Sequence, residues 1–363
     1  MEQKPEETPG EEIETQSPGG GRRLLRLGIL VLVLLTLTVY AAVTDSFNIP
    51  PEWAKARRSE AQMAIERVRA PAGRQYNGFD ISNASIPTEE ILRGGPSRDG
   101  IPAIDEPKFL PAADVNYLRD GDTVVGFVEQ GEARAYPLRI LVWHEIVNDT
   151  VGGRPIAVTY CPLCGTCMIF DRRYDGKELT FGVSGLLHNS DVLMYDRQTE
   201  SLWSQLKMEA VSGPQVGQKM HWLASEQMTW AAWKERYPDS DVLSKETGFG
   251  RTYDGLPYAG YEQTERTMFP VPKHRDELRN KEWVIGVIVD GLPKAYPIAE
   301  LEKLGDLPLD DVVGELPIEV SYDAAGQRAE VKEGTSGIAL PNVRVYWFAW
   351  QAFYPETELY SYD

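Results

Sequence analysis

Residues 123–137 read Thr-Val-Val-Gly-Phe-Val-Glu-Gln-Gly-Glu-Ala-Arg-Ala-Tyr-Pro, and elements of this block occur twice in the chain. β-branched and aromatic residues on both sides of the Gln130-Gly131 turn are the pattern of a β-hairpin. The block returns as Val-Ile-Gly-Val-Ile at 284–288 and Ala-Tyr-Pro at 295–297. A block repeated at a fixed spacing predicts two related structural units.

The repeat extends beyond this hairpin. Val-Gly-Gly-Arg-Pro-Ile at 151–156 matches Val-Gly-Glu-Leu-Pro-Ile at 313–318, and Thr-Tyr-Cys at 159–161 matches Ser-Tyr-Asp at 321–323. The second unit therefore builds the same hairpin with Asp-Ala-Ala-Gly at 323–326 in place of cysteines. We expect a mainly β (α+β) fold made of two related β-rich units built from hairpins, preceded by one N-terminal transmembrane helix.

The order of segments follows from composition and turn signals. One helix is expected at 226–237, stopped by Pro238. Further hairpins are expected from 146–151 with 156–160 and from 168–173 with 179–183. The predicted organisation is a disordered acidic cytoplasmic tail over 1–23, a transmembrane anchor over 24–43, a helical stalk and linker over 44–110, a β-rich unit with the cysteine loop over 111–255, a linker over 256–282 and a second related β-rich unit over 283–363.

The expected anchor has a clear apolar core. Residues 27–43 carry no charge, which is long enough to cross a bilayer, and Arg22, Arg23 and Arg26 come directly before them. Positive charge holds that end in the cytoplasm, so the rest of the chain is expected outside. A cleaved signal peptide is the alternative, but the long acidic leader and the length of the apolar run favour an anchor. The prediction is a single-pass protein of the cell membrane, with the main domain extracytoplasmic.

Charge and motifs narrow the function classes. The net charge of −18 argues against nucleic acid as a partner, because phosphate binding needs clustered Lys and Arg. No serine-hydrolase elbow, zinc-protease helix motif, phosphate loop or dinucleotide fingerprint is present in the sequence. The expected partners are the membrane, through the anchor, and an unknown small molecule or envelope protein.

All three cysteines lie in one run, Tyr-Cys-Pro-Leu-Cys-Gly-Thr-Cys, at 160–167. Proline fixes φ after Cys161 and glycine permits a left-handed backbone after Cys164, so both sulfurs face one side of a tight turn. Main-chain amides then point at the sulfurs, as in zinc ribbons and rubredoxin-like knuckles, which need further ligands. The candidate metal ligands are Cys161, Cys164, Cys167, His188 and His144.

Two other interpretations of the cysteines stay open. The same spacing suits thiol–disulfide exchange, with Cys161 attacking and Cys164 resolving, although the thioredoxin-like βαβ context is missing. A structural disulfide in an extracytoplasmic compartment is the third interpretation, and it leaves one odd thiol. The cofactor is accordingly a transition metal (zinc, copper or iron) or none.

A second polar region follows at 190–205. The simplest interpretation is a turn between strands. The functional interpretation is a pocket wall that faces the cysteine loop and binds a cofactor or small molecule. Its candidate residues are Asp191, Arg197, Trp203 and Gln205.

These segments carry a family resemblance. The chain over roughly 110–363 resembles a prokaryotic membrane-anchored family that is classed only as a domain of unknown function and carries the Thr-Tyr-Cys-Pro-Leu-Cys-Gly motif. The resemblance implies an exported or anchored bacterial or archaeal protein and brings no established reaction. Cys161 and Cys164 match the family pattern, whereas Cys167 stands where a small residue is expected. The matching segments are 159–165, 181–185, 189–191, 194–197, 201–205, both Ala-Tyr-Pro triplets and 347–350.

Two functions remain in competition at this point. The first is a membrane-anchored extracytoplasmic protein with a thiol-based metal-binding or redox site at Cys161 and Cys164. The alternative is a non-catalytic cell-envelope binding or scaffold module with a structural disulfide. The residues leave open whether the protein is an enzyme.

Overall fold

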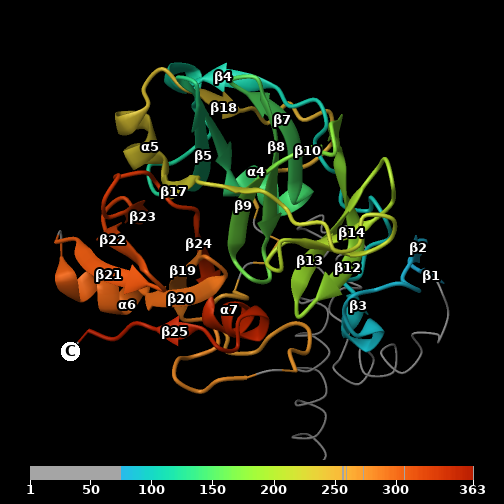
Figure 1. Cartoon of the computed structure of the whole chain (residues 1–363). Coiled ribbons are helices and arrows are strands. Elements are labelled where there is room, and N and C mark those ends of the chain that lie inside the picture. The colour runs from blue at the N-terminus through green and yellow to red at the C-terminus, as the bar shows by residue number, and fades with distance from the viewer. Residues whose placement is uncertain (1–74, 256, 259, 273, 306, 363) are drawn as a thin grey trace, which may run out of the picture. The chain divides into compact units, whose positions relative to one another are not determined.

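The computed structural model describes residues 75–362, apart from 256, 259, 273 and 306. They all belong to one compact unit, Glu52–Asp363. The prediction of a mainly β fold is confirmed, since small sheets pack in a propeller-like arrangement (Figure 1). The predicted tail over 1–23 and anchor over 24–43 lie outside the described residues. No helix within the described part is long and apolar enough to span a membrane.

The first copy of the repeat contains two sheets. One has the order β17-β5-β6-β18-β4 and the other the order β16-β9-β8-β7. The first sheet is antiparallel except for β18, which runs parallel to β6. Its elements are β4 (Phe109–Pro111), η2 (Ala112–Asp114), β5 (Thr123–Glu129), β6 (Glu132–Pro137), α4 (Leu138–His144), β7 (Ile146–Val151), β8 (Arg154–Cys161), β9 (Thr166–Asp171), β16 (Trp222–Leu223), β17 (Glu226–Thr229), α5 (Trp230–Arg236) and β18 (Asp241–Leu243).

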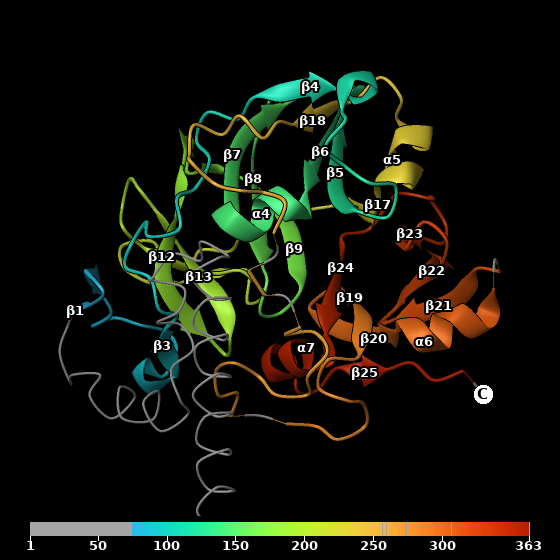
Figure 2. The same ribbon diagram turned by 180° about the vertical axis from the view of Figure 1, so that it is seen from behind.

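The second copy repeats this strand order among its described residues, but no strand stands at the places of β4 and β16. Its sheets are β24-β19-β20-β25 and β21-β22-β23, and β25 again runs parallel to its neighbour β20. In both views β24 lies next to β9 of the first copy (Figures 1 and 2). Its elements are β19 (Trp283–Val289), β20 (Leu292–Pro297), α6 (Ile298–Leu301), η3 (Glu302–Leu304), β21 (Leu309–Val313), β22 (Leu316–Asp323), β23 (Arg328–Glu333), β24 (Asn342–Tyr346), α7 (Trp347–Phe353) and β25 (Glu358–Leu359).

The two copies also agree in side-chain packing. Trp233 of α5 lies on Gly126 of β5, and Trp350 of α7 lies on Gly286 of β19. A Cβ added at Gly126 would lie 1.8 Å from the Trp233 ring, and one at Gly286 would lie 2.3 Å from the Trp350 ring. Each indole N–H donates to a hydroxyl seven residues on, at 2.8 Å and 2.9 Å respectively. Glycine in β5 and β19 is therefore required for a tryptophan to seat on the strand.

An inserted sheet separates the halves of the first copy. Its order is β15-β14-β13-β12-β3. Residues 172–221 contain most of it, whereas the second copy makes the same connection with residues 334–338. The elements before and inside the insertion are β1 (Gln75–Tyr76), β2 (Phe79–Asp80), η1 (Thr88–Glu90), β3 (Ile91–Arg93), β10 (Arg173–Tyr174), β11 (Lys177–Glu178), β12 (Phe181–His188), β13 (Asp191–Asp196), β14 (Leu202–Ser204) and β15 (Glu209–Ser212).

Two local predictions are wrong. The hairpin expected from 168–173 with 179–183 does not form, because β9 pairs with β8 and β16 while β12 joins the inserted sheet. The Asp175-Gly176 turn instead closes the two-stranded β10–β11 hairpin. The helix expected at 226–237 begins only at Trp230, since residues 226–229 pair with β5 as β17. A turn signal identifies a turn but leaves the strand partners open.

The two copies hold each other by reciprocal hydrogen bonds. The main-chain N–H of Tyr346, just before α7, donates to the carbonyl of Cys164 at 2.9 Å. The N–H of Thr229, just before α5, donates to the carbonyl of Gly326 at 2.8 Å. Tyr346 and Thr229 occupy matching places, as do Cys164 and Gly326. Each copy thus donates a hydrogen bond to the β-turn of the other, and the two contacts are equivalent, as they are across an isologous dimer interface.

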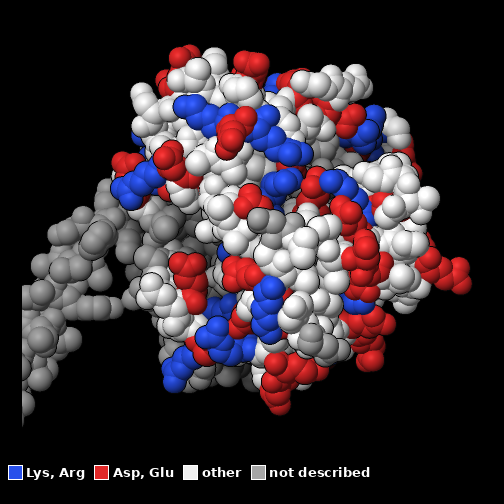
Figure 3. Space-filling view, turned by 90° about the vertical axis from the view of Figure 1, so that its left-hand side faces the viewer, with Lys and Arg blue, Asp and Glu red and all other residues white. Residues whose placement is uncertain are grey.

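Charged side chains are mixed on the surface. On the face shown in Figure 3, Lys and Arg side chains lie among Asp and Glu side chains. The ion pair of Arg328 with Glu226 at 3.5 Å is one link of this kind between the two copies. Acidic side chains on this face therefore have basic neighbours, although the chain as a whole keeps its net charge of −18.

Candidate metal site at the cysteine turn

The turn between β8 and β9 brings two cysteines and one carboxylate together. The sulfurs of Cys161 and Cys164 and a carboxylate oxygen of Asp191 all lie within 4.8 Å of one another. The three residues are at most 1% exposed. Two of the cysteines predicted as ligands and one residue predicted as a pocket wall therefore form one buried cluster, which we call the cysteine–aspartate cluster.

The cysteine turn packs closely against Trp283 of the second copy. Gly165 has φ +70, and a Cβ there would lie 2.4 Å from the Trp283 ring, so this position requires glycine. The matching turn of the second copy has Asp323 at the position of Cys161. One Asp323 oxygen accepts hydrogen bonds from the N–H groups of Ala325 and Gly326, both at 3.0 Å. The first position of this turn in the second copy therefore holds a carboxylate that main-chain N–H groups stabilise, and Cys161 occupies the matching position in the first copy.

The inserted sheet supplies the other half of the cluster. Asn189 and Ser190 form the two-residue turn between β12 and β13, with φ of +50 and +67, although neither is glycine. The Ser190 carbonyl accepts hydrogen bonds from the thiols of Cys161 at 3.6 Å and Cys164 at 3.3 Å. Positive φ at both central residues is the conformation of a two-residue type I′ hairpin turn, which Asn189 adopts readily.

Asp191 is only half satisfied. Its Oδ2 accepts a hydrogen bond from the Leu206 N–H at 2.9 Å. Its Oδ1 is buried and has no partner in hydrogen-bond geometry among the described residues. Buried carboxylate oxygens are rarely left in this condition, so Oδ1 is a position at which a cation or proton is expected.

Glu145 is a second buried carboxyl near the cluster. It ends α4 at φ +58, where the matching helical segment of the second copy ends on Gly305 at φ +62. Burial, with a smaller contribution from the charge of Asp191, raises the pKa of Glu145 to about 8. The sequence predictions did not include Glu145. The signal that could have found it is a glutamate at a helix C-terminus, where the left-handed conformation favours glycine.

The metal-free cluster holds protons. Burial raises the pKa of Asp191 to about 7, and the hydrogen bond from the Leu206 N–H is the largest of the opposing effects. Burial also raises the pKa of Cys161 and, more strongly, that of Cys164. Thiols of this kind are poor nucleophiles, because the thiolate is the reactive form. A metal would have to displace these protons on binding.

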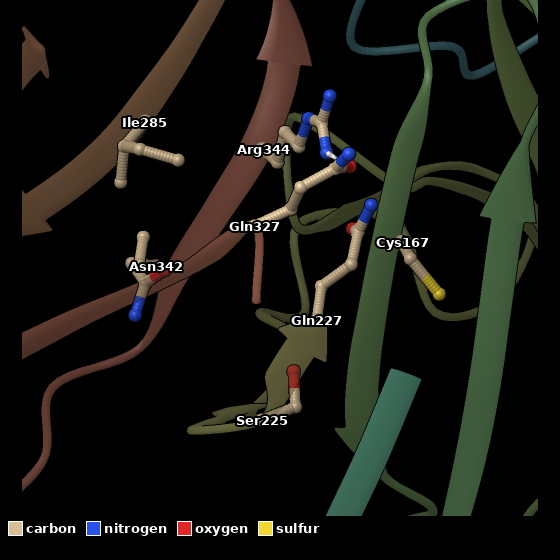
Figure 4. A pocket seen from close by; sticks show the side chains of 8 residues that line it. Cys167, Ser225, Gln227, Ile285, Gln327, Asn342 and Arg344 are labelled. Carbon is tan, nitrogen blue, oxygen red and sulfur yellow. Dashed lines mark hydrogen bonds between the residues drawn. The ribbon is translucent and has the colours of Figure 1, made fainter. Parts of the chain in front are cut away.

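The remaining predicted metal ligands lie elsewhere. Cys167 pairs across the sheet with Tyr160 and belongs to a different core cluster from Cys161 and Cys164. It borders a small cavity between the two copies, where Arg344 donates to Gln327 (Figure 4). Alternation along β9 explains this placement, since Cys167 and Thr166 face opposite sides of the sheet.

The two histidines make other contacts. His144 lies 2.7 Å from both the Pro102 carbonyl and the Tyr253 hydroxyl, and burial lowers its pKa to about 4. The ring of His188 contacts Glu90 at 3.3 Å and packs edge-on against Phe353. Neither histidine is part of the cysteine–aspartate cluster.

The predicted pocket wall is spread along the inserted sheet. Gln205 donates to Thr159 at 2.8 Å and accepts from Thr166 at 2.6 Å, which ties the sheet to the cysteine hairpin. The indole N–H of Trp203 donates to Asp196 at 2.9 Å. Arg197 contacts Asp99 at 3.3 Å, beyond the far end of β13 and about 20 Å from Asp191 at ~3.3 Å per strand residue.

The cysteines are all free thiols in the structure. The disulfide considered as one alternative is not present among the described residues, and it stays a prediction. What the turn offers instead is a pair of sulfurs beside an oxygen ligand.

Comparisons with known proteins give one match. A protein-family model described as "Protein of unknown function (DUF3179)" matches residues 98–357. No curated protein and no solved structure matches the chain.

Proposed function

The chain belongs to this family of unknown function, as the resemblance predicted, and we propose that it binds a divalent transition metal, zinc in the first instance. Cys161, Cys164 and Asp191 would hold the ion. The observation that carries the proposal is the buried carboxyl of Asp191, which has one oxygen within 4.8 Å of two sulfurs and an Oδ1 without a hydrogen-bond partner among the described residues.

The donor set selects the metal. Two thiolates exclude ions that prefer oxygen, such as Mg²⁺ and Ca²⁺, while one carboxylate disfavours Cu(I), which prefers sulfur throughout. Zn²⁺ accepts mixed sulfur and oxygen ligands and often has three protein ligands with a fourth position left for a small molecule. In the metal-free chain, burial raises the pKa of the neighbouring Glu145 carboxyl to about 8, and a bound cation would lower this pKa.

Metal content and Co²⁺ spectra test the proposal. We expect one equivalent of zinc in the full-length chain, and sulfur-to-cobalt charge-transfer bands when Co²⁺ replaces it. C161S and C164S should each weaken binding by at least ~100-fold, and D191N by roughly 10- to 100-fold with the sulfur bands retained. The control is C167S, which should bind like the wild type. Equal losses in C167S and C161S, or no metal in the wild type, would contradict the proposal.

A redox pair is the second candidate. Both sulfurs fall within the 4.8 Å cluster, so they need little movement to join. The raised pKa of both thiols works against fast exchange. A disulfide that forms reversibly near the glutathione potential, in a chain without bound metal, would favour this candidate.

We also propose that the cluster lies outside the cytoplasm. The support is the uncharged run over 27–43 with Arg22, Arg23 and Arg26 before it. Alkaline phosphatase fused after the last residue should be active, because it folds only outside the cytoplasm, while the same fusion lacking residues 22–43 should be inactive. Equal activity of both fusions would refute this placement.

A further inference from the structure

The second copy of the repeat has an alanine where the first copy has a tryptophan. Trp222 of β16 pairs with Phe170 of β9. In the second copy the matching pair is Ala339 with Lys332 of β23. The next residues also match, since Leu223 pairs with Ile169 and Leu340 donates its N–H to the Val331 carbonyl. The second copy therefore presents a methyl group at the place of an indole.

The surface beside this position differs accordingly. At the tryptophan position, Trp222 and Ile288 of β19 pack against the same core cluster. The counterpart of Ile288 in the repeated hairpin is Val128 of β5, which is 41% exposed. The surface covered near Trp222 is thus open near Ala339.

A cavity of about 220 Å³ occupies this open place. Val128, Val331, Ala339 and Leu340 give it apolar walls. A dry cavity of roughly 150 Å³ is known to hold benzene, so this one suits a ring system of two fused rings. At the matching position, the first copy carries the indole ring of Trp222.

The polar lining limits the occupant further. The carboxyl-bearing residues Glu226 and Glu330 line the cavity, together with Ser225 and Asn342. Both carboxylates form ion pairs with Arg328, so the acceptors that we assign to a ring N–H are the Ser225 hydroxyl and the Asn342 amide oxygen.

We propose that this cavity, here called the indole cavity, binds a small planar aromatic molecule of indole size with an N–H donor. The proposal does not depend on the metal site, because none of the lining residues belongs to the cysteine–aspartate cluster.

Indole itself is the probe, titrated into the full-length chain by calorimetry. The wild type should bind one equivalent. A339W should fill the cavity and lose at least ~10-fold in affinity, with a melting temperature equal to or above that of the wild type. I338W is the matched control, because Ile338 is the exposed neighbour at 63%, and it should bind as the wild type does.

A converse variant keeps the test decisive if A339W does not fold. W222A should open the matching space in the first copy and raise the number of bound indoles from one to two. Undiminished binding by A339W, one site in W222A, or no binding by the wild type up to the solubility of indole would overturn the proposal. Binding of a tryptophan-containing peptide without binding of indole would assign the cavity to a partner's side chain and also overturn it.

Discussion

The metal-free chain should lose stability as the pH rises from 5 to 8, in contrast to proteins whose carboxylates are stabilised by salt bridges. The pKa of Glu145 is raised to about 8 and that of Asp191 to about 7 by burial. Over this window the folded chain retains protons that the unfolded chain releases. Their contribution to stability is therefore fully present below the unfolded pKa of each acid and is lost as the pH rises toward the folded one.

The size of the effect follows from linkage. Each such carboxyl removes up to about 1.4 kcal/mol per pH unit, or roughly 2 kcal/mol each between pH 5 and 7. His144 opposes this trend, because its pKa is lowered to about 4 and its contribution to stability grows as the pH rises to its unfolded value. The net loss is therefore smaller than the sum of the two acids, and differences between variants are the informative quantity.

Urea unfolding with a chelator at pH 5, 6, 7 and 8 measures these slopes. E145Q and D191N should each flatten the pH dependence by roughly 1 kcal/mol per unit near pH 6, whereas E132Q, at a half-buried ion pair, should leave it unchanged. Parallel curves for the wild type and E145Q would show that Glu145 is ionised in the folded chain. Bound zinc should reverse the slope, because it requires the deprotonated ligands.

Replacing Gly126 by alanine should be among the most damaging single changes in the chain. The new Cβ would lie 1.8 Å from one ring carbon of Trp233 and 2.1 Å from another, and the indole cannot retreat because it is fully buried. Strand β5 and helix α5 would have to separate, at a cost of roughly 3 kcal/mol or more. G286A should behave alike, since its Cβ would lie 2.3 Å from Trp350.

The comparison variant is G121A, because Gly121 has no atom near the position of its Cβ. It should change the free energy of unfolding by less than about 0.5 kcal/mol. W233L alone leaves a cavity in the core. The double variant G126A/W233L should lose less unfolding free energy than the two single variants lose together, with a coupling energy of at least about 1 kcal/mol. Unfolding of G126A at the same urea concentration as G121A would refute the packing argument.

Local signals in the sequence predict much of the fold. Gln130-Gly131 and Gly152-Gly153 mark turns whose flanking strands pair as expected, in β5–β6 and β7–β8. The tryptophan-bearing helices α5 and α7 also correspond to each other. Because the insertion precedes α5 alone, the two helices are not separated by the roughly 160 residues that separate the repeated hairpins. The spacing of the hairpins therefore did not predict that these helices correspond. Strand partners across the insertion depend on tertiary packing, which a single sequence does not encode in readable form.

The site was predictable to a similar extent. Cys161 and Cys164 stand out because cysteine is otherwise confined to Cys167. Asp191 was found as a pocket residue, but nothing in its sequence spacing places it beside sulfurs that precede it by more than 25 residues. Glu145 was missed, because its contribution depends on burial and on a positive φ, and both arise only in the folded chain.

The reciprocal hydrogen bonds between each copy and the β-turn of the other have an evolutionary consequence. In a symmetric dimer of identical chains, one mutation alters both turns together, so a change that suits one turn and harms the other is lost. Joining the copies in one chain lets each turn be selected separately. Asp323 can then remain an ordinary turn-stabilising carboxylate while Cys161 and Cys164 specialise, and the inserted sheet can supply Asp191 to one turn alone. A chain that contains both copies can therefore carry a cysteine–aspartate cluster at one turn and an ordinary carboxylate turn at the other.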